Sequence, residues 1–563
     1  SSCFARGDLF VTLARMTSDR VTDVLVIGGG LAAISAAIAA AEAGAAVIVA
    51  NKGVTGTAGS SAKAAGILAA PFGHGGLDGQ PVDDSPARHA ADSLAVGHHL
   101  GAPELVTVMA EQACAAVDWL EGYGVPFSRG ETGKFVQLNA PGNSRPRACS
   151  AIGGGAAIMQ IMIGAARRMG IIFLDHLSAY RLHHIDGHIC GAAFCDPAGS
   201  SHHITAGAVV LCAGGATGLF PTVSGDADNI GNGLVLGLQA GAALGNLEFV
   251  EYTLIYRVNN QLLRIAGMAP FLSRGGRLLN NDGTDVLATH FAGTPSEQLG
   301  RAEILRLVQS EIIQGRGPVW LDCRSFSDAV WAEFESSQGD VVLAKITAAG
   351  GDYRSEKIEV VPAAHSVLAG LVIDQNAATG VAGLFAAGEN VTGIHGAGRL
   401  SGNGLTACVV MGRIAGKNAS RDAHQIAGQV SASSDDCLPP PQNLPTERLD
   451  TAMRAALIAK MRDAAGKGLG IIRNQSGIAG AEFVFAYIVK KFAPPYPLHP
   501  ADQDILQMGI LGQLMCVAAA QRLESRGVQW RDDATTLDKN WKKWQIVTQS
   551  ADGGYSWRER VMR

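Results

Sequence analysis

A run of three glycines between a short apolar strand and an alanine-rich helix constrains this chain more than any other feature. Residues 24–27 form an apolar, β-type run, Gly28 to Gly30 follow, residues 31–43 have a helical composition, and residues 46–50 have the pattern of a second strand. This order predicts a βαβ unit. Glycines at such a junction let the backbone approach a pyrophosphate at the positive end of the helix. The loop therefore favours a bound dinucleotide over a merely tight turn, without separating FAD from NAD.

The composition indicates a large folded protein that buries most of its apolar residues. The 563 residues are enough for about three or four domains. Apolar residues make up 47% and charged residues 17% of the chain, against roughly 25% charged residues in an average soluble protein. The 71 glycines are about twice the usual share and follow no collagen-like period. Disorder and a small disulfide-stabilised scaffold are therefore excluded.

The charges and the cysteines limit which partners and which cellular compartment we expect for this protein. A formal net charge of −5, with no run of lysines or arginines, argues against a nucleic acid partner. The 10 cysteines include no C-x-x-C pair, so we expect no metal site and a reducing, cytoplasmic location. The apolar residues 24–50 are interrupted by glycines, by Glu42 and by Gly44, so we expect protein core there and no membrane span.

Changes in composition along the chain indicate a discontinuous first domain. The high content of glycine and alanine ends near residue 246 and returns at 365–412. A proline cluster at 439–445 has the composition of a stiff linker. The predicted fold class is α/β, a Rossmann-type domain with an inserted α+β domain and a C-terminal helical domain. We predict a leader or arm, or alternatively a folded element, at 1–19, the first part of the nucleotide-binding domain at 20–245, the inserted domain at 246–351, the second part of the first domain at 352–435, and the helical domain at 436–563.

Three segments further along favour FAD over NAD. Ala213 and Gly214 close a strand, residues 384–390 are a strand that ends at a carboxylate, and residues 395–405 form a glycine-rich loop that leads into a helix. A second helix N-terminus in the same domain offers amides to a second polar region of an extended cofactor. Asn51 stands where an acid that binds the ribose is expected, and its amide can still bond a hydroxyl.

These motifs, in this order, resemble the flavoproteins that include L-aspartate oxidase and the flavin subunits of fumarate reductase and succinate dehydrogenase. The resemblance covers roughly residues 20–533, and it includes GSS at 59–61, GNSR at 142–145, EFV at 248–250, HGAGRL at 395–400 and ESRG at 524–527. It implies FAD in a Rossmann-type FAD-binding domain, a mobile capping domain in place of the inserted domain, and a helical C-terminal domain.

The resemblance also implies which residues hold FAD. Glu389 matches an acid that bonds the ribityl chain, and Ser401 and Leu405 match positions near the isoalloxazine. Members with covalent FAD carry a histidine just before the segment that matches residues 60–61, and this chain has Gly59 there, so we expect noncovalent FAD. The residues expected at the cofactor are Gly28, Gly30, Ala33, Asn51, Lys52, Ser60, Ser61, Gly66, Ala213, Gly214, Gly388, Glu389, Ser401, Asn403 and Leu405.

Two residues keep the substrate-binding pattern of the family. Arg399 matches an arginine that holds a substrate carboxylate, a task that suits a planar guanidinium, and His365 matches a substrate-binding histidine. Considered without the family, Arg399 could instead be a structural partner of a phosphate or of a helix cap. His365 could instead be a buried, hydrogen-bonded histidine. Their positions beside the expected flavin loop favour a site for a small anionic substrate.

Two other signatures of the family are missing. Where the family has F-H-P-T, this chain has Tyr252, Thr253, a leucine and Ile255, and where it has R-G-E-G-G, Leu272 stands at the proton-donating arginine. In an extended segment Arg274 points to the same face as Leu272 and can supply the charge, with a solvated or structural arginine as the alternative. The predicted catalytic residues are His365, Arg399, Arg274, Thr253 and Tyr252.

The sequence therefore predicts an FAD-dependent oxidoreductase that moves a hydride between flavin N5 and a small carboxylate-bearing substrate, namely an amino, hydroxy or dicarboxylic acid. Strict succinate or fumarate chemistry is disfavoured, because the usual proton donor is not at its position. The alternative is a remodelled subunit that is noncatalytic or relays electrons within a larger complex. Both interpretations allow a partner that is an electron-transfer protein or subunit.

Overall fold

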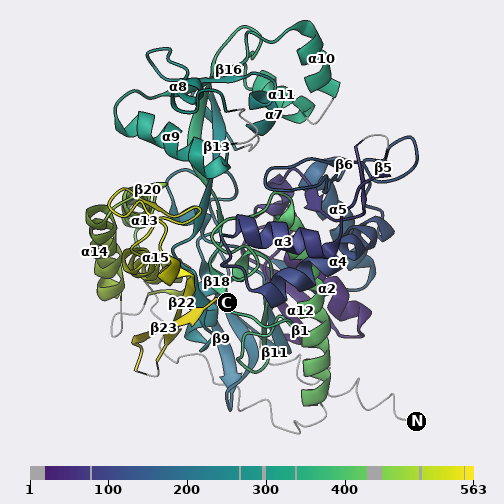
Figure 1. Cartoon of the computed structure of the whole chain (residues 1–563). Coiled ribbons are helices and arrows are strands. Elements are labelled where there is room, and N and C mark those ends of the chain that lie inside the picture. The colour runs from purple at the N-terminus through teal and green to yellow at the C-terminus, as the bar shows by residue number, and fades with distance from the viewer. Residues whose placement is uncertain are drawn as a thin grey trace.

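The structure is a computed structural model that describes residues 20–76, 79–264, 268–294, 299–336, 339–427, 447–492, 498–550 and 552–562. The predicted leader at 1–19 and the proline cluster lie outside the described residues. Figure 1 shows a body that contains the N-terminal and C-terminal segments and, above it, a lobe that carries the helices α8 to α11. The long strand β13 runs from the body into this lobe.

The predicted βαβ unit forms the centre of a seven-stranded sheet among the described residues. β1 (Arg20–Ile27) and β2 (Val47–Asn51) are parallel, and α2 (Leu31–Glu42) connects them. β2 and the second half of β1 are buried, which explains their continuous apolar runs. Along the sheet the order is β8 (Ile172–Asp175), β2, β1, β11 (Ser201–Leu211), β10 (His188–Cys195) and β9 (Ser178–Ile185), and β19 (Leu384–Ala386) also pairs with β11.

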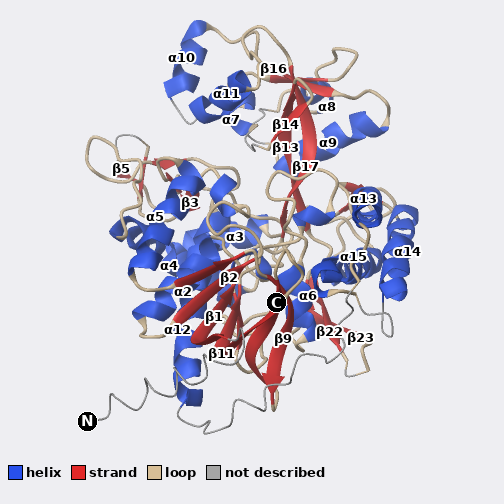
Figure 2. Cartoon of the chain, turned by 180° about the vertical axis from the view of Figure 1, so that it is seen from behind, coloured by secondary structure: helices blue, strands red, loops and turns tan. Residues whose placement is uncertain are grey.

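Residues beyond the insertion complete this sheet and its helical layer. β19 pairs with β11 in parallel, and α12 (Asn403–Ala427) packs along α2 and over β1. Figure 2 shows α2 and α12 on the same side of the sheet. The two helices approach closely at two glycines of α12. A Cβ at Gly412 would lie 2.6 Å from Ala32 O, and one at Gly416 would lie 1.9 Å from Ala36 O. Only glycine permits this approach at these two positions.

The inserted segment folds around its own antiparallel sheet, which we call the sheet of the inserted lobe. Its strands, in order, are β14 (Gln261–Leu263), β13 (Val250–Val258), β17 (Ile358–Val367), β16 (Val319–Asp322) and β15 (Arg277–Leu279). The helices of the lobe are α7 (Ala269–Leu272), α8 (Val286–His290), α9 (Arg301–Ile313), α10 (Asp328–Ser336) and α11 (Gly339–Ala348). The predicted end of the insertion at residue 351 is too early, because β17 pairs with β13 as far as Val367.

The C-terminal segment is helical at first and then ends in a hairpin. α13 (Thr451–Gly468), α14 (Gln475–Phe492) and α15 (Gln503–Gln521) pack together, as the periodicity predicts. A hairpin of β22 (Lys543–Gln549) and β23 (Tyr555–Val561), which was not predicted, follows them. β22 pairs with β12 (Leu244–Gly245), and β12 pairs with β18 (Gly370–Leu371), so the hairpin joins the segments that flank the inserted lobe.

A buried ion-pair network ties the C-terminal segment to the base of β13. Arg522 Nε donates to Glu248 Oε1 at 2.6 Å, and Arg522 Nη1 donates to Glu524 Oε1 at 2.9 Å. All three side chains are fully buried. Three residues beyond Glu524, a Cβ at Gly527 would lie only 2.0 Å from Ala397 O, so the ESRG turn packs directly against the HGAGRL loop at 395–400.

The remaining elements cover the body. The helices are α3 (Pro86–Val96), α4 (Pro103–Gly122), α5 (Gly154–Arg168) and α6 (Asn232–Gln239), and the short strands are β3 (Ile67–Ala69), β4 (His74–Gly75), β5 (Gln80–Pro81), β6 (Gln137–Leu138), β7 (Ala148–Ser150), β20 (Ile472–Arg473) and β21 (Trp530–Arg531). Within the ranges given above, no helix combines the length and the apolar character needed to cross a membrane.

Candidate cofactor and substrate site

The glycine loop after β1 lies against the segment that follows β11, and its shape fits a nucleotide pyrophosphate. Gly28 has a φ of +124°, and a Cβ there would lie 2.2 Å from Cys212 O. At Gly29 a Cβ would lie 2.4 Å from Asn51 Nδ2, so the predicted Asn51 side chain lies beside the loop. These contacts exclude side chains from the loop and leave its backbone open to a ligand.

The first turn of α2 provides the amides for a phosphate. Gly30 is the N-cap residue and supplies no side-chain acceptor to the helix. Ser61 Oγ accepts from Leu31 N at 3.0 Å, and Ser60 Oγ accepts from Asn229 Nδ2 at 3.1 Å. Both predicted serines thus lie at or next to this helix N-terminus, where an anion is favoured.

Glu389 follows β19 and presents a carboxylate to the same region. Its Oε1 accepts from Val367 N at 2.9 Å, and a Cβ at Gly215 would lie 2.3 Å from this oxygen. Burial raises the pKa of Glu389 to about 7. Hydroxyl donors, such as those of a ribityl chain, would stabilise its charged form. The carboxylate therefore fits the predicted role toward FAD.

His395, at the start of the HGAGRL loop, offers a second polar atom that a cofactor can satisfy. Its Nδ1 is buried without a hydrogen-bond partner among the described residues. Burial lowers the pKa of His395 to about 3, so the ring is neutral near pH 7. Buried polar atoms are normally paired, and a polar edge of a flavin is a suitable partner.

Two predicted cofactor residues are instead paired with protein groups. Lys52 Nζ lies 3.8 Å from a carboxylate oxygen of Asp504 in α15. Asn403 Nδ2 donates to Ser93 Oγ at 2.8 Å, and its Oδ1 lies 2.7 Å from His89 Nε2. The Asn403 side chain thus fastens α12 to α3, and we assign it no direct bond to the cofactor.

The other predicted cofactor residues lie in turns or at the ends of helices and strands of the same domain. Gly66 has a φ of +79°, and a Cβ there would lie 2.6 Å from Gly154 Cα. The carbonyl of Ser401 accepts from Asn143 Nδ2 at 3.1 Å. Leu405 is half-buried at the start of α12, and Ala33 is fully buried in α2. Gly214, which follows Ala213, and Gly388 have positive φ values in the turns after β11 and β19.

The residues predicted to bind the substrate, His365 and Arg399, lie where the inserted lobe meets the HGAGRL loop. In the pairing of β13 with β17, Glu251 is opposite Ser366 and Tyr252 is opposite Ala364, so His365 is an extra residue in β17. Such a bulge changes the direction of the side chain that it contains. The irregularity brings His365 to the charged groups of β13 and the loop.

His365 is held as a neutral imidazole. Its Nδ1 lies 2.8 Å from Ser224 Oγ, and the same hydroxyl lies 3.4 Å from Ala364 O. Burial lowers the pKa of His365 to about 3, with Glu251 opposing this shift and Arg399 and Arg301 adding to it. When the Ser224 hydroxyl donates to the carbonyl, His365 donates through Nδ1, which leaves Nε2 as an acceptor.

Glu251 joins two arginines that come from different parts of the fold. Arg399 donates from Nε and Nη2 to Glu251 Oε2, at 3.0 and 2.7 Å. Arg301, the first residue of α9 in the inserted lobe, donates from Nη1 to Glu251 Oε1 at 2.8 Å. Glu251 is only 4% exposed. Burial alone would raise the pKa of this carboxyl, but Arg399 and Arg301 outweigh it and lower the pKa to about 2.

Glu251 and Arg301 were not predicted from the sequence. A signal for Glu251 exists, because an acid inside an otherwise buried strand requires a charged partner. For Arg301 the local signal specifies only a helix start, where Glu303 Oε2 accepts from Gly300 N at 2.8 Å. The pairing itself spans 50 residues of sequence.

Arg274 does not reach this cluster, and the prediction that it supplies the missing cation is wrong. Its Nη1 donates to Pro270 O at 3.0 Å and its Nη2 donates to Glu333 Oε1 at 2.9 Å, while the guanidinium lies 5.6 Å from the centre of the Phe334 ring. The prediction assumed an extended segment, but α7 covers Leu272 and a turn follows it. The structural alternative is the correct one, and Arg301 is the arginine of the lobe at the cluster.

Tyr252 faces the C-terminal helices. Its hydroxyl donates to Leu469 O at 3.0 Å, and its ring packs edge-on against Phe220 at 5.8 Å. Tyr252 lines a groove of about 440 Å³ between the inserted lobe and α13, together with Gln309 and Lys467. Thr253 is buried opposite Ala363 in β17.

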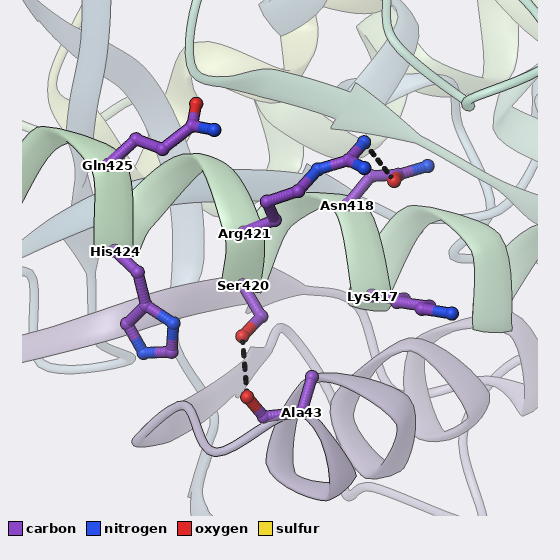
Figure 3. A pocket seen from close by; sticks show the side chains of 7 residues that line it. All are labelled: Ala43, Lys417, Asn418, Ser420, Arg421, His424 and Gln425. Atoms are coloured by element: carbon purple, nitrogen blue, oxygen red, sulfur yellow. Dashed lines mark hydrogen bonds between the residues drawn. The ribbon is translucent and has the colours of Figure 1, made fainter.

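A second groove, of about 370 Å³, lies on α12 beside the end of α2 (Figure 3). Ser420 Oγ donates to Ala43 O at 3.4 Å, and Arg421 Nη2 donates to Asn418 Oδ1 at 2.7 Å. The residues predicted for the cofactor and the substrate do not line this groove, so we do not assign the reaction to it.

Known proteins match this chain over most of its length. The family described as "FAD binding domain" matches residues 23–405, and the family described as "Fumarate reductase flavoprotein C-term" matches residues 504–560. The chain is 31% identical over 521 residues to the L-aspartate oxidase of Agrobacterium fabrum, covering 91% of each protein. It is 28% identical over 551 residues to a subunit of the fumarate reductase (CoM/CoB) of Methanothermobacter marburgensis, covering 92% of this chain and 96% of that protein.

Solved structures show the same fold. FrdA of the E. coli quinol fumarate reductase superposes with a TM-score of 0.83 at 24% identity, with 97% of each chain covered. Sdh1 of Mycobacterium smegmatis superposes with a TM-score of 0.80 at 28% identity, covering 97% of this chain and 95% of that chain. The mixed α/β fold and its C-terminal helical region therefore match those of these proteins.

Proposed function

The chain belongs to the FAD-dependent flavoprotein family that includes L-aspartate oxidase and fumarate reductase flavoproteins, and from that premise we propose that it moves a hydride between flavin N5 and a small carboxylate-bearing substrate. The observation that carries this proposal is the position of Arg399. Arg399 lies in the loop expected to face the flavin, and the buried Glu251 fixes its guanidinium next to the neutral His365. Bound FAD supplies a two-electron acceptor or donor at N5.

Arg399 binds and orients the substrate in this proposal. The bonds to Glu251 use Arg399 Nε and Nη2, and they leave Nη1 for a substrate oxygen. Arg301 approaches from the inserted lobe and bonds the other oxygen of Glu251, so it helps to fix the carboxylate that orients Arg399. A substrate carboxylate bonded to Arg399 fixes the neighbouring carbon relative to the flavin.

His365 handles the proton. When a hydride leaves a carbon that bears an amine or a hydroxyl, the proton of the heteroatom must pass to a base. The lone pair of His365 Nε2 is the candidate acceptor, because Ser224 occupies Nδ1. The carboxylate of Glu251 favours the protonated form of His365, which stabilises the charge as it develops.

We propose that FAD is held without a covalent bond. Gly59 stands where covalent members carry a histidine, and its N donates to Asp226 Oδ2 at 2.7 Å. A Cβ at Gly59 would have no atom within 4 Å, so the position offers space but no nucleophile. Gly28, Gly30 and Ser61 would hold the pyrophosphate, and Glu389 the ribityl chain.

We also propose a reducing, cytoplasmic location and an electron-transfer partner. The 10 cysteines without a C-x-x-C pair support the location. The solved M. smegmatis relative was described as an Sdh1 complex, which supports a partner subunit.

The test is an absorption spectrum of the purified protein before and after denaturation, followed by anaerobic addition of single amino, hydroxy and dicarboxylic acids. We expect released flavin, and bleaching of the bound flavin by at least one acid. Flavin that stays with the denatured chain contradicts the noncovalent proposal. The second candidate function is favoured if the flavin is noncovalent but does not react with the acids in the native protein. In that case no saturated acid bleaches it, and no unsaturated acid reoxidises it after chemical reduction. That candidate, an electron-relay subunit, is favoured by the way Glu251 already occupies both arginines.

A further inference from the structure

The carboxylate of Glu251 occupies the position in which the two arginines would otherwise receive a carboxylate from solution. It bridges Arg399 and Arg301, with one oxygen bonded to each, at distances between 2.7 and 3.0 Å. The side chain of Glu251 is only 5% exposed and that of Arg399 only 12%. A buried carboxylate with two guanidinium partners is a permanent part of the site and does not exchange freely with solvent.

The charges around the substrate-binding histidine leave room for one anionic group. The charged groups that act on His365 are Glu251, Arg399 and Arg301. His365 itself is neutral near pH 7, because burial lowers its pKa to about 3. Within this cluster two guanidiniums and one carboxylate leave one positive charge. Glu389 also acts on Arg399, but burial raises its pKa to about 7 and we assign it to the cofactor. A substrate with one carboxylate balances the positive charge of the cluster, whereas a second carboxylate would have to be buried without a cationic partner.

The strand next to the cluster offers no replacement cation. Thr253 and Ile255 follow Glu251 in β13, and both are buried. The nearest expected substitute, Arg274, is paired with Glu333 in α10 of the lobe. The other charged residue of β13, Arg257, is paired with Glu359, so β13 offers no unpaired cation to a second carboxylate.

We propose that Glu251 is a specificity-determining residue that restricts the site to monocarboxylates, namely 2-amino or 2-hydroxy acids with an uncharged side chain, and excludes dicarboxylates. This inference rests on the proposed function, since it concerns the same site. Glu251 takes the place of the second carboxylate of a dicarboxylic substrate and neutralises one of the two guanidinium charges. Arg399 alone then binds the carboxylate of the substrate through Nη1.

The test measures equilibrium binding to the FAD-loaded protein without oxygen, by flavin difference spectra and by the shift in the thermal unfolding midpoint. Matched ligand pairs differ only in a methyl group against a carboxylate: L-2-aminobutyrate against L-aspartate, and 2-hydroxybutyrate against malate. For the unmodified protein we expect the monocarboxylate of each pair to bind more tightly by about tenfold or more. Equal or tighter binding of the dicarboxylates overturns the inference.

Glu251→Gln keeps the shape and removes the charge. We expect it to strengthen dicarboxylate binding by about tenfold or more and to change monocarboxylate binding much less. Glu333→Gln, which removes the partner of Arg274 outside the cluster, is the matched control and should leave the ratio of the two affinities unchanged. An unchanged ratio in Glu251→Gln contradicts the assigned role of Glu251.

Failure of the underlying function gives a different result. If neither class of acid perturbs the flavin or raises the unfolding midpoint in the unmodified protein and in Glu251→Gln, the proposed function is wrong and the inference is rejected with it. If Glu251→Gln does not retain FAD, Glu251→Asp keeps the charge and should keep the preference for monocarboxylates. A reversed preference in Glu251→Asp, or in the unmodified protein, rejects the inference alone.

Discussion

Replacing Gly527 by alanine tests whether the C-terminal domain fixes the loop that carries Arg399. Gly527 has a φ of +56°, and a Cβ there would lie 2.0 Å from Ala397 O, two residues before Arg399. The next residue, Val528, donates from its N to the same oxygen at 2.9 Å. The loop cannot move away from the new methyl group without lengthening this bond.

The expected magnitude follows from these two features. A left-handed conformation costs a residue other than glycine about 1–2 kcal/mol, and forcing a methyl group into closely packed atoms costs about 1–3 kcal/mol more. Gly527→Ala should therefore lower the free energy of unfolding by about 2–5 kcal/mol. Gly170→Ala is the matched control, because Gly170 has a φ of +81° and a Cβ there would have no atom within 4 Å. The control should lose only the conformational part, about 1–2 kcal/mol.

Urea unfolding, followed by tryptophan fluorescence, compares the two variants with the unmodified protein. The affinity of the FAD-loaded protein for a monocarboxylate ligand should also fall in Gly527→Ala and stay unchanged in Gly170→Ala, because only the first variant displaces the loop before Arg399. An equal loss of stability in both variants, with equal ligand affinity, would refute the reasoning. It would mean that the ESRG turn and the HGAGRL loop move independently.

Three further predictions concern the cofactor loop and the core. Burial raises the pKa of Glu389 from its ordinary 4.5 to about 7, so the FAD-free protein should lose stability as the pH rises between these values, and Glu389→Gln should not; urea midpoints at about pH 5 and pH 8 compare them. Arg522→Met leaves the fully buried Glu248 without its partner at 2.6 Å, which should cost about 3–5 kcal/mol of unfolding free energy, partly recovered in the double variant with Glu248→Met. Gly416→Ala places a Cβ 1.9 Å from Ala36 O and should separate α12 from α2 at a cost of about 1–3 kcal/mol, with loss of FAD detected by gel filtration.

The cofactor half of the site could be predicted from the sequence, because its signals are local. The strand, the glycines and the helix of the βαβ unit lie within residues 24–50. Gly28 can occupy a φ of +124° only because it lacks a side chain, so its identity alone indicates a turn of this type. Glu389 is recognisable because a carboxylate directly after a buried strand lies at the edge of the sheet where ligands bind.

The substrate half could be predicted only in part, because its geometry depends on irregularities and distant contacts. The direction of the His365 side chain depends on a bulge between β13 and β17, and no residue pattern in either strand predicts this bulge. Arg274 was placed by assuming an extended segment, and the short helix α7 invalidates that assumption. Arg301 begins a helix in another part of the lobe, 50 residues from Glu251, so only the folded chain brings them together.

The Glu251 cluster also couples stability to recognition in a way that limits what single substitutions can reveal. Residues 250–256 of β13 are all buried, so a carboxylate at 251 is tolerated only while Arg399 and Arg301 neutralise it. Removing Arg399 therefore does two things at once: it deletes a substrate ligand and leaves a buried charge with one partner. Because Arg301 belongs to the inserted lobe and Arg399 to the body, the same change also weakens the contact between these two parts. Glu251→Gln keeps both guanidiniums but leaves their positive charges without this carboxylate. Glu251→Asp keeps the charge, so comparing the stability and the ligand preference of the two variants separates charge selection from the integrity of the fold.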